Sequence, residues 1–259
     1  MTTVLKLGGS VVTDKSEPET VDREALDDAA AAIAAADTTG GSDAVGTADS
    51  DGLVVVHGGG SFGHHHAAAH GVTDTEGTHD VEGVLAIHDA MRELNDAVVG
   101  ALQDRDVPAL PVHPLSTAHR DSAGETTLPS EQVETMLAEE FVPVLHGDVI
   151  AQSNEGATVL SGDEIVTLLA RQLAADRVGL CSTVPGVLDA DDEVIERIER
   201  FEAVADALGA SDATDVTGGM AAKVRELLDL DTPASIFGPA DLAAFLAGEQ
   251  PGTLVQRRR

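Results

Sequence analysis

The sequence predicts an α/β fold with a largely parallel central sheet. Short apolar runs alternate with amphipathic helical patterns along the whole chain, a pattern typical of strand–helix–strand architecture. Hydrophobic residues make up 42% of the 259 residues, which is enough for a full core, whereas aromatic residues make up only 2%. We therefore expect one compact body of one or two lobes, packed mainly with Val, Leu, Ile and Ala.

Each element follows from its local pattern. Short apolar runs, of which 53–57 is the strongest, predict strands over residues 3–7, 53–57, 110–112, 142–145, 177–181 and 234–237. Between them, helical periodicity predicts helices over residues 23–36, 81–103, 131–139, 164–174, 200–208, 220–230 and 240–247. Residues 37–51 are rich in Gly, Thr, Ser and Asp and predict a surface loop without assigned chemistry.

The charge balance restricts the environment and the partners of the chain. There are 46 acidic against 15 basic residues, and the formal net charge is -31. Such a charge destabilises the compact state until salt screens it, so we expect a salt-adapted protein rather than an ordinary acidic one. The hydrophobic content excludes an acidic disordered chain, and the charge disfavours nucleic acid as a partner.

Cysteine usage and hydropathy indicate a cytoplasmic protein. Cys181 is the single cysteine, which excludes an internal disulfide framework. The first ten residues enter a strand-like run without the apolar segment of a signal peptide. No apolar stretch approaches the roughly 18 residues that a membrane span needs, so we expect no membrane partner.

The first motif is Lys6-Leu-Gly-Gly-Ser10, in which a predicted strand runs directly into two glycines. Glycines allow backbone N–H groups to turn toward an anion without obstruction by a Cβ. Lys6 and Lys15 bracket the turn, and an ammonium group compensates phosphate charge well. A plain strand-to-helix turn with solvated lysines is the alternative for this motif alone.

The second motif, His57-Gly-Gly-Gly-Ser-Phe-Gly-His64, follows the strongest predicted strand and indicates a phosphate loop. Its glycines also satisfy the dinucleotide-binding spacing, but the polar residues 73–80 replace the second strand and acidic residue that this alternative needs. A Walker A loop is excluded because the chain has no Gly-Lys dipeptide. His64 follows the last glycine and is well placed to bind a phosphate, with an exposed neutral histidine as the alternative.

The same segment also carries a histidine cluster. The adjacent rings of residues 64–66 diverge on a helix, but His66 and His70 are spaced to share one ion. Neither carboxylate nor thiol accompanies them, so we predict no metal site there.

The third motif is Asp215-Val-Thr-Gly-Gly-Met-Ala-Ala-Lys223. Its glycines open a predicted helix, and Lys223 can reach back over the helix N-terminus toward a bound anion. Thr217 as an ordinary N-cap beside a solvated lysine is the alternative. Asp163, at another predicted helix start, can act as an N-cap and can also align two lysines, since the two roles are compatible.

Lysine usage reinforces these interpretations. Lys6, Lys15 and Lys223 are the only lysines of the chain, and all three lie in or beside glycine-rich turns. A surface that has largely discarded lysine retains it where a function requires it. We therefore predict an ATP-dependent kinase whose lysines hold the phosphates.

In their order and spacing the motifs resemble the amino acid kinase superfamily over essentially the whole chain. Four further motifs are similar to its isopentenyl phosphate kinase branch: Gly58-Gly-Gly-Ser-Phe-Gly-His64, Asp14-Lys15, His146-Gly-Asp148 and Gly252-Thr253. The resemblance implies a three-layer α/β/α sandwich, with an acceptor-binding lobe over residues 1–170 and a nucleotide-binding lobe over residues 171–259 of one continuous fold. It also implies ATP-dependent phosphorylation of isopentenyl phosphate to isopentenyl diphosphate for isoprenoid biosynthesis, with Mg²⁺ and a homodimer.

By position, the resemblance assigns Lys15 to transition-state stabilisation and Asp163 to orienting Lys6 and Lys223. It assigns ATP contacts to Lys6, Gly8, Gly9, Ser10, Gly59, Thr183, Gly218, Gly219 and Lys223. It assigns acceptor contacts to Gly58, Gly63, His64 and Gly156, with His64 counted among the catalytic residues.

One turn departs from the pattern of the relatives. Many of them carry Asp-Val-Asp-Gly-Val near the base and ribose, where this chain has Thr183-Val-Pro-Gly-Val187. Base and ribose contacts therefore stay open. A kinase of the same fold with another acceptor, such as an amino acid, carbamate or nucleoside monophosphate, is the first alternative. A non-catalytic nucleotide-binding protein is the second.

Overall fold

The computed structural model describes residues 1–37, 52–205, 208 and 219–257. Almost all of the predicted loop 37–51 lies outside these residues, and so do Thr217 and Gly218. The strands are β1 (Thr2–Leu7), β2 (Gly52–His57), β3 (Ala109–Pro111), β4 (His119–Arg120), β5 (Thr126–Thr127), β6 (Val142–His146), β7 (Asp148–Gln152), β8 (Gly156–Leu160), β9 (Arg177–Cys181), β10 (Arg197–Ile198), β11 (Ala234–Phe237) and β12 (Thr253–Val255).

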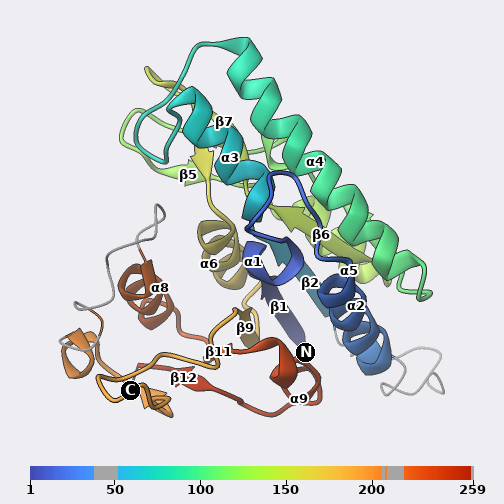
Figure 1. Cartoon of the computed structure of the whole chain (residues 1–259), viewed down its shortest axis with the longest axis vertical. Helices are drawn as coiled ribbons and strands as arrows, with labels where there is room; N and C mark the ends of the chain where they lie inside the picture. The colour runs from blue at the N-terminus through green and yellow to red at the C-terminus, as the bar shows by residue number, and fades with distance from the viewer. Residues whose placement is uncertain (38–51, 206–207, 209–218, 258–259) are drawn as a thin grey trace.

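The helices alternate with these strands (Figure 1). They are α1 (Gly9–Val12), α2 (Arg23–Asp37), α3 (Gly60–His70), α4 (Val81–Gln103), α5 (Glu131–Ala138), α6 (Gly162–Gln172), α8 (Gly219–Leu228) and α9 (Leu242–Leu246). Short 3₁₀ turns are η1 (Pro114–Ser116), η2 (Phe201–Ala203) and η3 (Pro239–Asp241).

An eight-stranded sheet forms the centre of the molecule, in the order β10-β12-β11-β9-β1-β2-β6-β3. Its described pairings are parallel except for β11 with β12. In register, Leu7 of β1 lies opposite His57 of β2 and Cys181 of β9. The carboxyl ends of three neighbouring strands therefore meet at one edge of the sheet, where α/β folds bind ligands.

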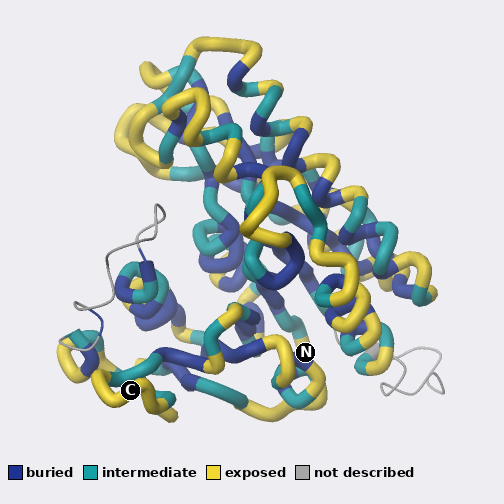
Figure 2. The backbone as a smooth tube through the Cα atoms, in the orientation of Figure 1, coloured by how far each residue is buried: buried dark blue, intermediate teal, exposed yellow. Residues whose placement is uncertain are grey.

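Helices cover both faces of this sheet, which gives the three-layer sandwich. Buried side chains of α2, α4 and α9 pack in one apolar cluster, with Leu26, Leu94 and Phe245 among them. Those of α5, α6 and α8 pack in a second cluster on the opposite face. Figure 2 shows the sheet strands as the most buried part of the backbone. The alternation of apolar runs and amphipathic helices in the sequence thus produces the predicted sheet with helices on both faces.

A second sheet of four strands, in the order β5-β4-β7-β8, lies near α3 and the start of α4 in the upper part of Figure 1. The sequence patterns do not predict it: β4 and β5 have only two residues each, and no strand is predicted over β7 or β8, which have five residues each. A fully buried side chain, Ile150, packs from β7 into the main core. The small sheet therefore folds against the large one rather than standing apart.

Several predicted boundaries hold and others shift. The strands 177–181 and 234–237 and the helix 81–103 coincide with β9, β11 and α4. Helix α3 was not among the predicted helices, because its glycines and consecutive histidines hide any apolar period. The predicted helix 200–208 begins as the 3₁₀ turn η2, and residues 206–207 lie outside the described ones. The predicted helix 240–247 divides into η3 and α9.

Candidate active site

The two N-terminal glycine turns touch each other through their backbones. The amide of Gly58 donates to the carbonyl of Leu7 at 3.0 Å. A Cβ placed on Gly9 would lie 2.1 Å from the nitrogen of Gly60, and one on Gly58 would lie 2.7 Å from the nitrogen of Gly9. Because neither contact leaves room for a side chain, these positions require glycine.

Backbone amides remain available at this junction. Helices α1 and α3 both begin there, and the first amides of a helix have no partner within it. In the described part of the chain, the amides of Gly9, Ser10, Gly59 and Gly60 donate no hydrogen bond to another group. The amide of Gly8, in contrast, donates to the carbonyl of Cys181 at 2.8 Å. Free N–H groups at a helix start form a surface suited to an anion.

Lys6, Asp163 and Lys223 form a charged cluster beside this junction, which we call the lysine–aspartate cluster. The Lys6 ammonium lies 2.7 Å from Asp163 Oδ1, and the Lys223 ammonium lies 3.7 Å from Oδ2. Lys6 is only 8% exposed. Helix α6 supplies the carboxylate in its first turn, and Ser161 is the N-cap through a 3.1 Å bond from the Glu164 amide. The alternative of Asp163 as the cap is therefore wrong.

One carboxylate lies between two largely buried ammonium groups in this cluster. Glu226 of α8 also acts on both lysines: burial, followed by the charges of Asp163 and Glu164, raises its pKa, and the charges of Lys223 and Lys6 oppose that rise. Ammonium groups and free backbone amides both attract phosphate oxygens, so the cluster and the two glycine turns together are suited to an anion.

A second buried ion pair supports the start of α6. Arg120 is 5% exposed, and its guanidinium lies 2.7 Å from Glu164 Oε2. The same side chain donates to Thr158 Oγ1 at 2.8 Å and to the carbonyl of Val159 at 3.2 Å. It therefore ties the small sheet to the turn that carries Asp163. Sequence reasoning missed this residue, since its partner lies 44 positions away.

Lys15 and His64 lie on the surface, unlike the cluster. Lys15 is exposed in the loop between the bridged residues Thr13 and Val21. Beside it, hydrogen bonds from Ser16 lower the pKa of the Asp14 carboxyl. His64 is exposed one turn into α3. Ion pairs join three of the five predicted catalytic residues, Lys6, Asp163 and Lys223, whereas Lys15 belongs to the loop after α1 and His64 to α3.

The neighbouring histidines face different partners. His66 Nε2 lies 2.7 Å from Glu19 Oε1, and His70 Nδ1 lies 3.7 Å from Asp80 Oδ2. Among the described residues, no group of three or more His, Cys, Asp or Glu side chains is arranged to hold a metal ion. His66 therefore contributes to holding the Lys15 loop against α3, because Glu19 belongs to that loop.

The predicted acceptor glycines also have packing reasons. A Cβ on Gly63 would lie 2.6 Å from Met91 Sδ of α4. Gly156 begins β8 with a φ of +87°, and a Cβ there would lie 2.2 Å from the Thr78 carbonyl oxygen. Gly63 and His64 share α3 with the glycine turn, whereas Gly156 belongs to the small sheet. These glycines thus position α3, α4 and the small sheet closely around one another.

The predicted nucleotide-side residues lie at two places. Gly219 begins α8 with a φ of +62° and is buried, and Gly218 lies outside the described residues. Thr183 is exposed in the turn after β9. Next to it, the amide of Ser182 donates to the carbonyl of Phe237 at 2.8 Å, which fixes the start of this turn.

Four imidazoles behind the glycine turns were not predicted. The rings of His57 and His146 are fully buried and stacked, with their centroids 5.6 Å apart. His113 Nδ1 lies 2.9 Å from His146 Nε2. His88 Nδ1 lies 3.0 Å from both oxygens of the buried Asp148 carboxylate. His57 and His146 belong to motifs that the sequence analysis names, but no sequence signal indicates that the four rings lie together.

These contacts shift the pKa values in opposite directions. Burial, followed by the nearby His146, lowers the pKa of His57 to about 3. Burial also lowers the pKa values of His113 and His146. The hydrogen bond to Asp148 raises the pKa of His88. His57, His113 and His146 are consequently neutral near pH 7, whereas the Asp148 carboxylate favours a charged His88.

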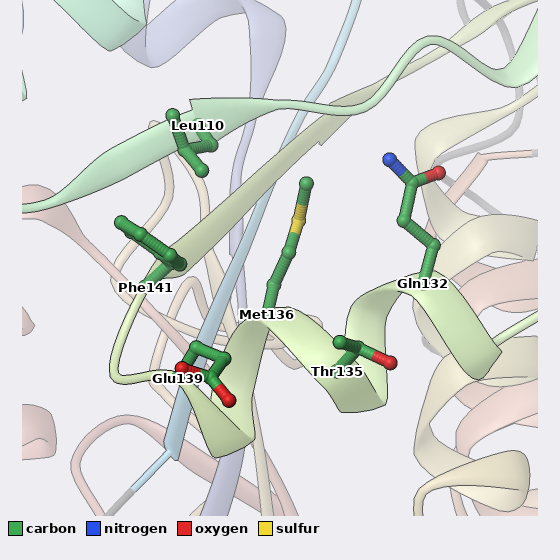
Figure 3. A pocket seen from close by; sticks show the side chains of 6 residues that line it. All are labelled: Leu110, Gln132, Thr135, Met136, Glu139 and Phe141. Atoms are coloured by element: carbon green, nitrogen blue, oxygen red, sulfur yellow. The ribbon is translucent and has the colours of Figure 1, made fainter.

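An apolar groove of about 310 Å³ lies elsewhere, at the edge strand β3. Figure 3 shows Met136 projecting from α5 toward β3, with Leu110 and Phe141 beside it. Phe141 is 40% exposed. None of the predicted site residues lines this groove, so it is separate from the lysine–aspartate cluster.

No helix in the described ranges is long and apolar enough to cross a membrane.

Comparisons with known proteins agree with the geometry. The sequence model of the amino acid kinase family matches residues 1–230. Isopentenyl phosphate kinase of Haloferax volcanii is 62% identical over 253 residues, which cover 98% of each chain. The enzyme of that name from Methanocaldococcus jannaschii is 33% identical over 232 residues, covering 86% of this chain and 85% of that one.

A solved structure gives the same result at the level of the fold. An X-ray structure of isopentenyl phosphate kinase superposes with a TM-score of 0.79 at 26% identity, over 98% of both chains. The predicted α/β/α sandwich is thereby confirmed. The chain belongs to the amino acid kinase family and, within it, to the isopentenyl phosphate kinases.

Proposed function

We propose that the chain transfers the terminal phosphoryl group of ATP to isopentenyl phosphate, giving isopentenyl diphosphate and ADP. The observation that carries this proposal is the lysine–aspartate cluster beside two glycine turns with free amides. The full-length similarity to an isopentenyl phosphate kinase at 62% identity supports the choice of acceptor. The transfer serves isoprenoid biosynthesis.

On the donor side, Lys6 and Lys223 hold phosphate oxygens of ATP, and Asp163 keeps their ammonium groups in position. The amides of Gly9, Ser10 and Gly59 complete the phosphate contacts, and the family resemblance assigns Gly8, Gly218 and Gly219 to ATP as well. Thr183 is assigned to ATP binding, and its turn leaves the base and ribose contacts open. Charge on the transferred group is spread over several oxygens, so fixed cations that need no rearrangement lower the barrier.

On the acceptor side, Gly58, Gly63, His64 and Gly156 surround the phosphate of isopentenyl phosphate, and His64 donates a hydrogen bond to it. A phosphate monoester has a second pKa of about 6 and is already anionic at neutral pH. The acceptor phosphate therefore needs no general base to remove a proton. One of its oxygens forms a bond to the terminal phosphorus of ATP while the bridging P–O bond to ADP breaks. Lys15 offsets the charge of this transition state.

Mg²⁺ is expected to accompany ATP. The described residues offer no cage of three or more side-chain ligands, and Asp163 is engaged with both lysines. Mg²⁺ is commonly held by substrate phosphates and water with few protein ligands. We therefore assign it no protein ligand. When bound, the ion neutralises charge on the phosphate chain.

Three further features are part of the proposal. A net charge of -31 supports salt adaptation of the enzyme and argues against nucleic acid as a partner. A single buried cysteine fits a reducing cytoplasm. A homodimer is the expected assembly, and the groove at β3 with the exposed Phe141 is a surface that dimerisation would cover.

An ADP-release assay at high KCl tests the proposed reaction. Isopentenyl phosphate, dimethylallyl phosphate, acetylglutamate, carbamate and UMP are offered separately with MgATP, and Lys6→Met serves as the control for contaminating kinases. We expect ADP release that depends on isopentenyl phosphate. If ADP were released only with a non-isoprenoid acceptor, the proposed substrate would be wrong. If ADP were released without any acceptor, the proposed transfer reaction would be wrong.

A further inference from the structure

Two neighbouring strands end in the same dipeptide. Strand β2 ends in His57 followed by Gly58, and β6 ends in His146 followed by Gly147. The two histidines lie opposite each other in the register, and their fully buried rings are stacked. The dipeptides therefore form a matched pair, although only the first belongs to a glycine turn of the active site.

The hydrogen bonds of His146 fix the position of its proton. Nδ1 lies 2.9 Å from the carbonyl oxygen of Gly147, and Nε2 lies 2.9 Å from His113 Nδ1. A carbonyl oxygen only accepts hydrogen bonds, so Nδ1 of His146 carries the proton. Nε2 is then an acceptor, and His113 donates to it.

His57 has the same arrangement. Its Nδ1 lies 3.2 Å from the carbonyl oxygen of Gly58, and its Nε2 lies 3.1 Å from the side-chain oxygen of Asn95 on α4. Both neighbours are acceptors, but burial lowers the pKa of His57 to about 3, and a neutral ring has only one N–H. One of the two contacts therefore needs a different donor.

Asn95 supplies that donor when its amide is turned. Its nitrogen is buried and has no hydrogen-bond partner among the described residues. The oxygen and nitrogen of an amide have nearly the same shape, so their assignment depends on the hydrogen-bond network. Exchanging them lets Asn95 donate to His57 Nε2 and gives the buried nitrogen a partner. His57 Nδ1 then carries the proton and donates to Gly58.

This donation determines where the next amide points. The peptide between Gly58 and Gly59 is trans, so its carbonyl and its N–H point in opposite directions. The carbonyl is held toward the His57 ring, and the Gly59 amide therefore points away from this ring. That amide is one of those that donate to no other group in the described structure.

We propose that His57 is a positioning residue, which holds the Gly58 carbonyl through Nδ1–H and thereby aims the Gly59 amide at a phosphate of the nucleotide. Asn95 fixes the required tautomer from the other side of the ring. The phosphate in this statement rests on the proposed function, whereas the tautomer and the direction of the amide do not.

Two substitutions of His57 distinguish the role of the Nδ1 hydrogen-bond donor from that of the buried ring. In His57→Asn the side-chain nitrogen replaces Nδ1, whereas in His57→Gln it falls nearer to Nε2. We expect His57→Gln to lower kcat about 100-fold, as a small misplacement of a phosphate contact does, and His57→Asn to lower it about 10-fold or less. The melting temperatures of the two variants should fall by similar amounts, because both remove the buried ring.

His146→Asn and His146→Gln are the matched controls, since this ring is equally buried and donates to a glycine outside the predicted site. The His146 ring is stacked on His57, so we expect both control variants to lower stability and to have kcat values within about 3-fold of each other, well short of the effect of a misplaced contact. Equal kcat losses in the two His57 variants, or a difference between the two His146 variants as large as that expected for His57, would overturn the proposal.

A spectroscopic measurement decides the tautomer in the unmodified enzyme. Nitrogen-15 NMR of the imidazoles distinguishes Nδ1–H from Nε2–H, and we expect Nδ1–H for His57. An Nε2–H tautomer would overturn the proposal even if the variants failed to fold. Absence of transfer to isopentenyl phosphate by the wild-type enzyme would instead contradict the proposed function, and the NMR result would stand independently of it.

Discussion

The buried and exposed halves of the candidate site differ in how they are held. The side chains of Lys6 and Asp163 are 10% and 13% exposed, and that of Lys223 is 19% exposed. Lys15 and His64 are exposed on a loop and on α3. The buried half is therefore fixed by ion pairs without a ligand, whereas the exposed half lies at the surface, where a single charge contributes little to stability. Loss of a buried charge should affect stability and activity together, and loss of an exposed one only activity.

The largest expected losses of activity follow substitution of Lys6 or Lys15, and only the Lys6 variant should also lose stability. Lys6→Met removes a fixed cation and should lower kcat roughly 1,000-fold, the upper range for one transition-state contact. It should also lower the melting temperature, because Asp163 loses its closer partner. Lys15→Met should lower kcat roughly 100-fold but change the free energy of unfolding by less than about 0.5 kcal/mol. Steady-state kinetics and thermal unfolding at one KCl concentration give both values. A destabilised Lys15→Met with a stable Lys6→Met would contradict the comparison.

Asp163→Asn gives the next largest effect. Without the carboxylate, two buried ammonium groups repel each other, so the free energy of unfolding should fall by about 3 kcal/mol. Asp229→Asn is the matched control, because its partner Arg257 lies 2.9 Å away and both side chains are at least 60% exposed. That substitution should cost less than about 1 kcal/mol. Urea unfolding of both variants at equal salt measures the difference, and equal losses would show that burial of the cluster has no energetic weight.

Much of the buried half could be predicted from the sequence. Lys6 follows an apolar strand, and glycine turns after parallel strands must meet at one sheet edge, so local pattern and topology are sufficient. The scarcity of lysine in an acidic chain pointed to the same residues. The choice between Asp163 as cap and as lysine partner could not be made, because Ser161 two positions earlier is an equally good cap.

The supporting residues could not be predicted. Arg120 contacts Glu164 across 44 positions, and His57 contacts Asn95 across 38. Such pairs follow from the way the small sheet and α4 pack against the rest of the chain. The local periodicity of apolar residues does not specify this packing. The short strands of the small sheet carry too few residues for an alternating pattern to stand out. Long-range polar contacts therefore had to come from the structure.

A smaller effect concerns His88. Its pKa is raised by the hydrogen bond to Asp148, so the charged pair stabilises the fold fully below the ordinary value of 6.5. This stabilisation is lost as the pH rises through the raised value in the folded state. The pKa values of His57, His113 and His146 are lowered, so their contribution has the opposite sign and increases as the pH rises through 6.5. These three rings are present in the wild-type protein and in a His88 variant alike, so the difference between the two proteins reports on His88.

Thermal unfolding at pH 6.5 and pH 8.5 checks this expectation. Over the interval, the melting temperature of the wild-type protein should fall relative to that of His88→Gln, because only the wild-type protein loses the charged pair of His88 and Asp148. The same slope in both proteins would mean that His88 does not supply the pH dependence.

Calorimetric titration of both ligands into two variants tests the division of the site most directly. Lys223→Met should weaken binding of ATP about 10-fold, as loss of a charge-assisted contact does, and leave binding of isopentenyl phosphate unchanged. His64→Asn should do the reverse. If Lys223→Met weakened only acceptor binding, or if each variant weakened both ligands equally, the account of a fixed nucleotide half and a separate acceptor half would be contradicted.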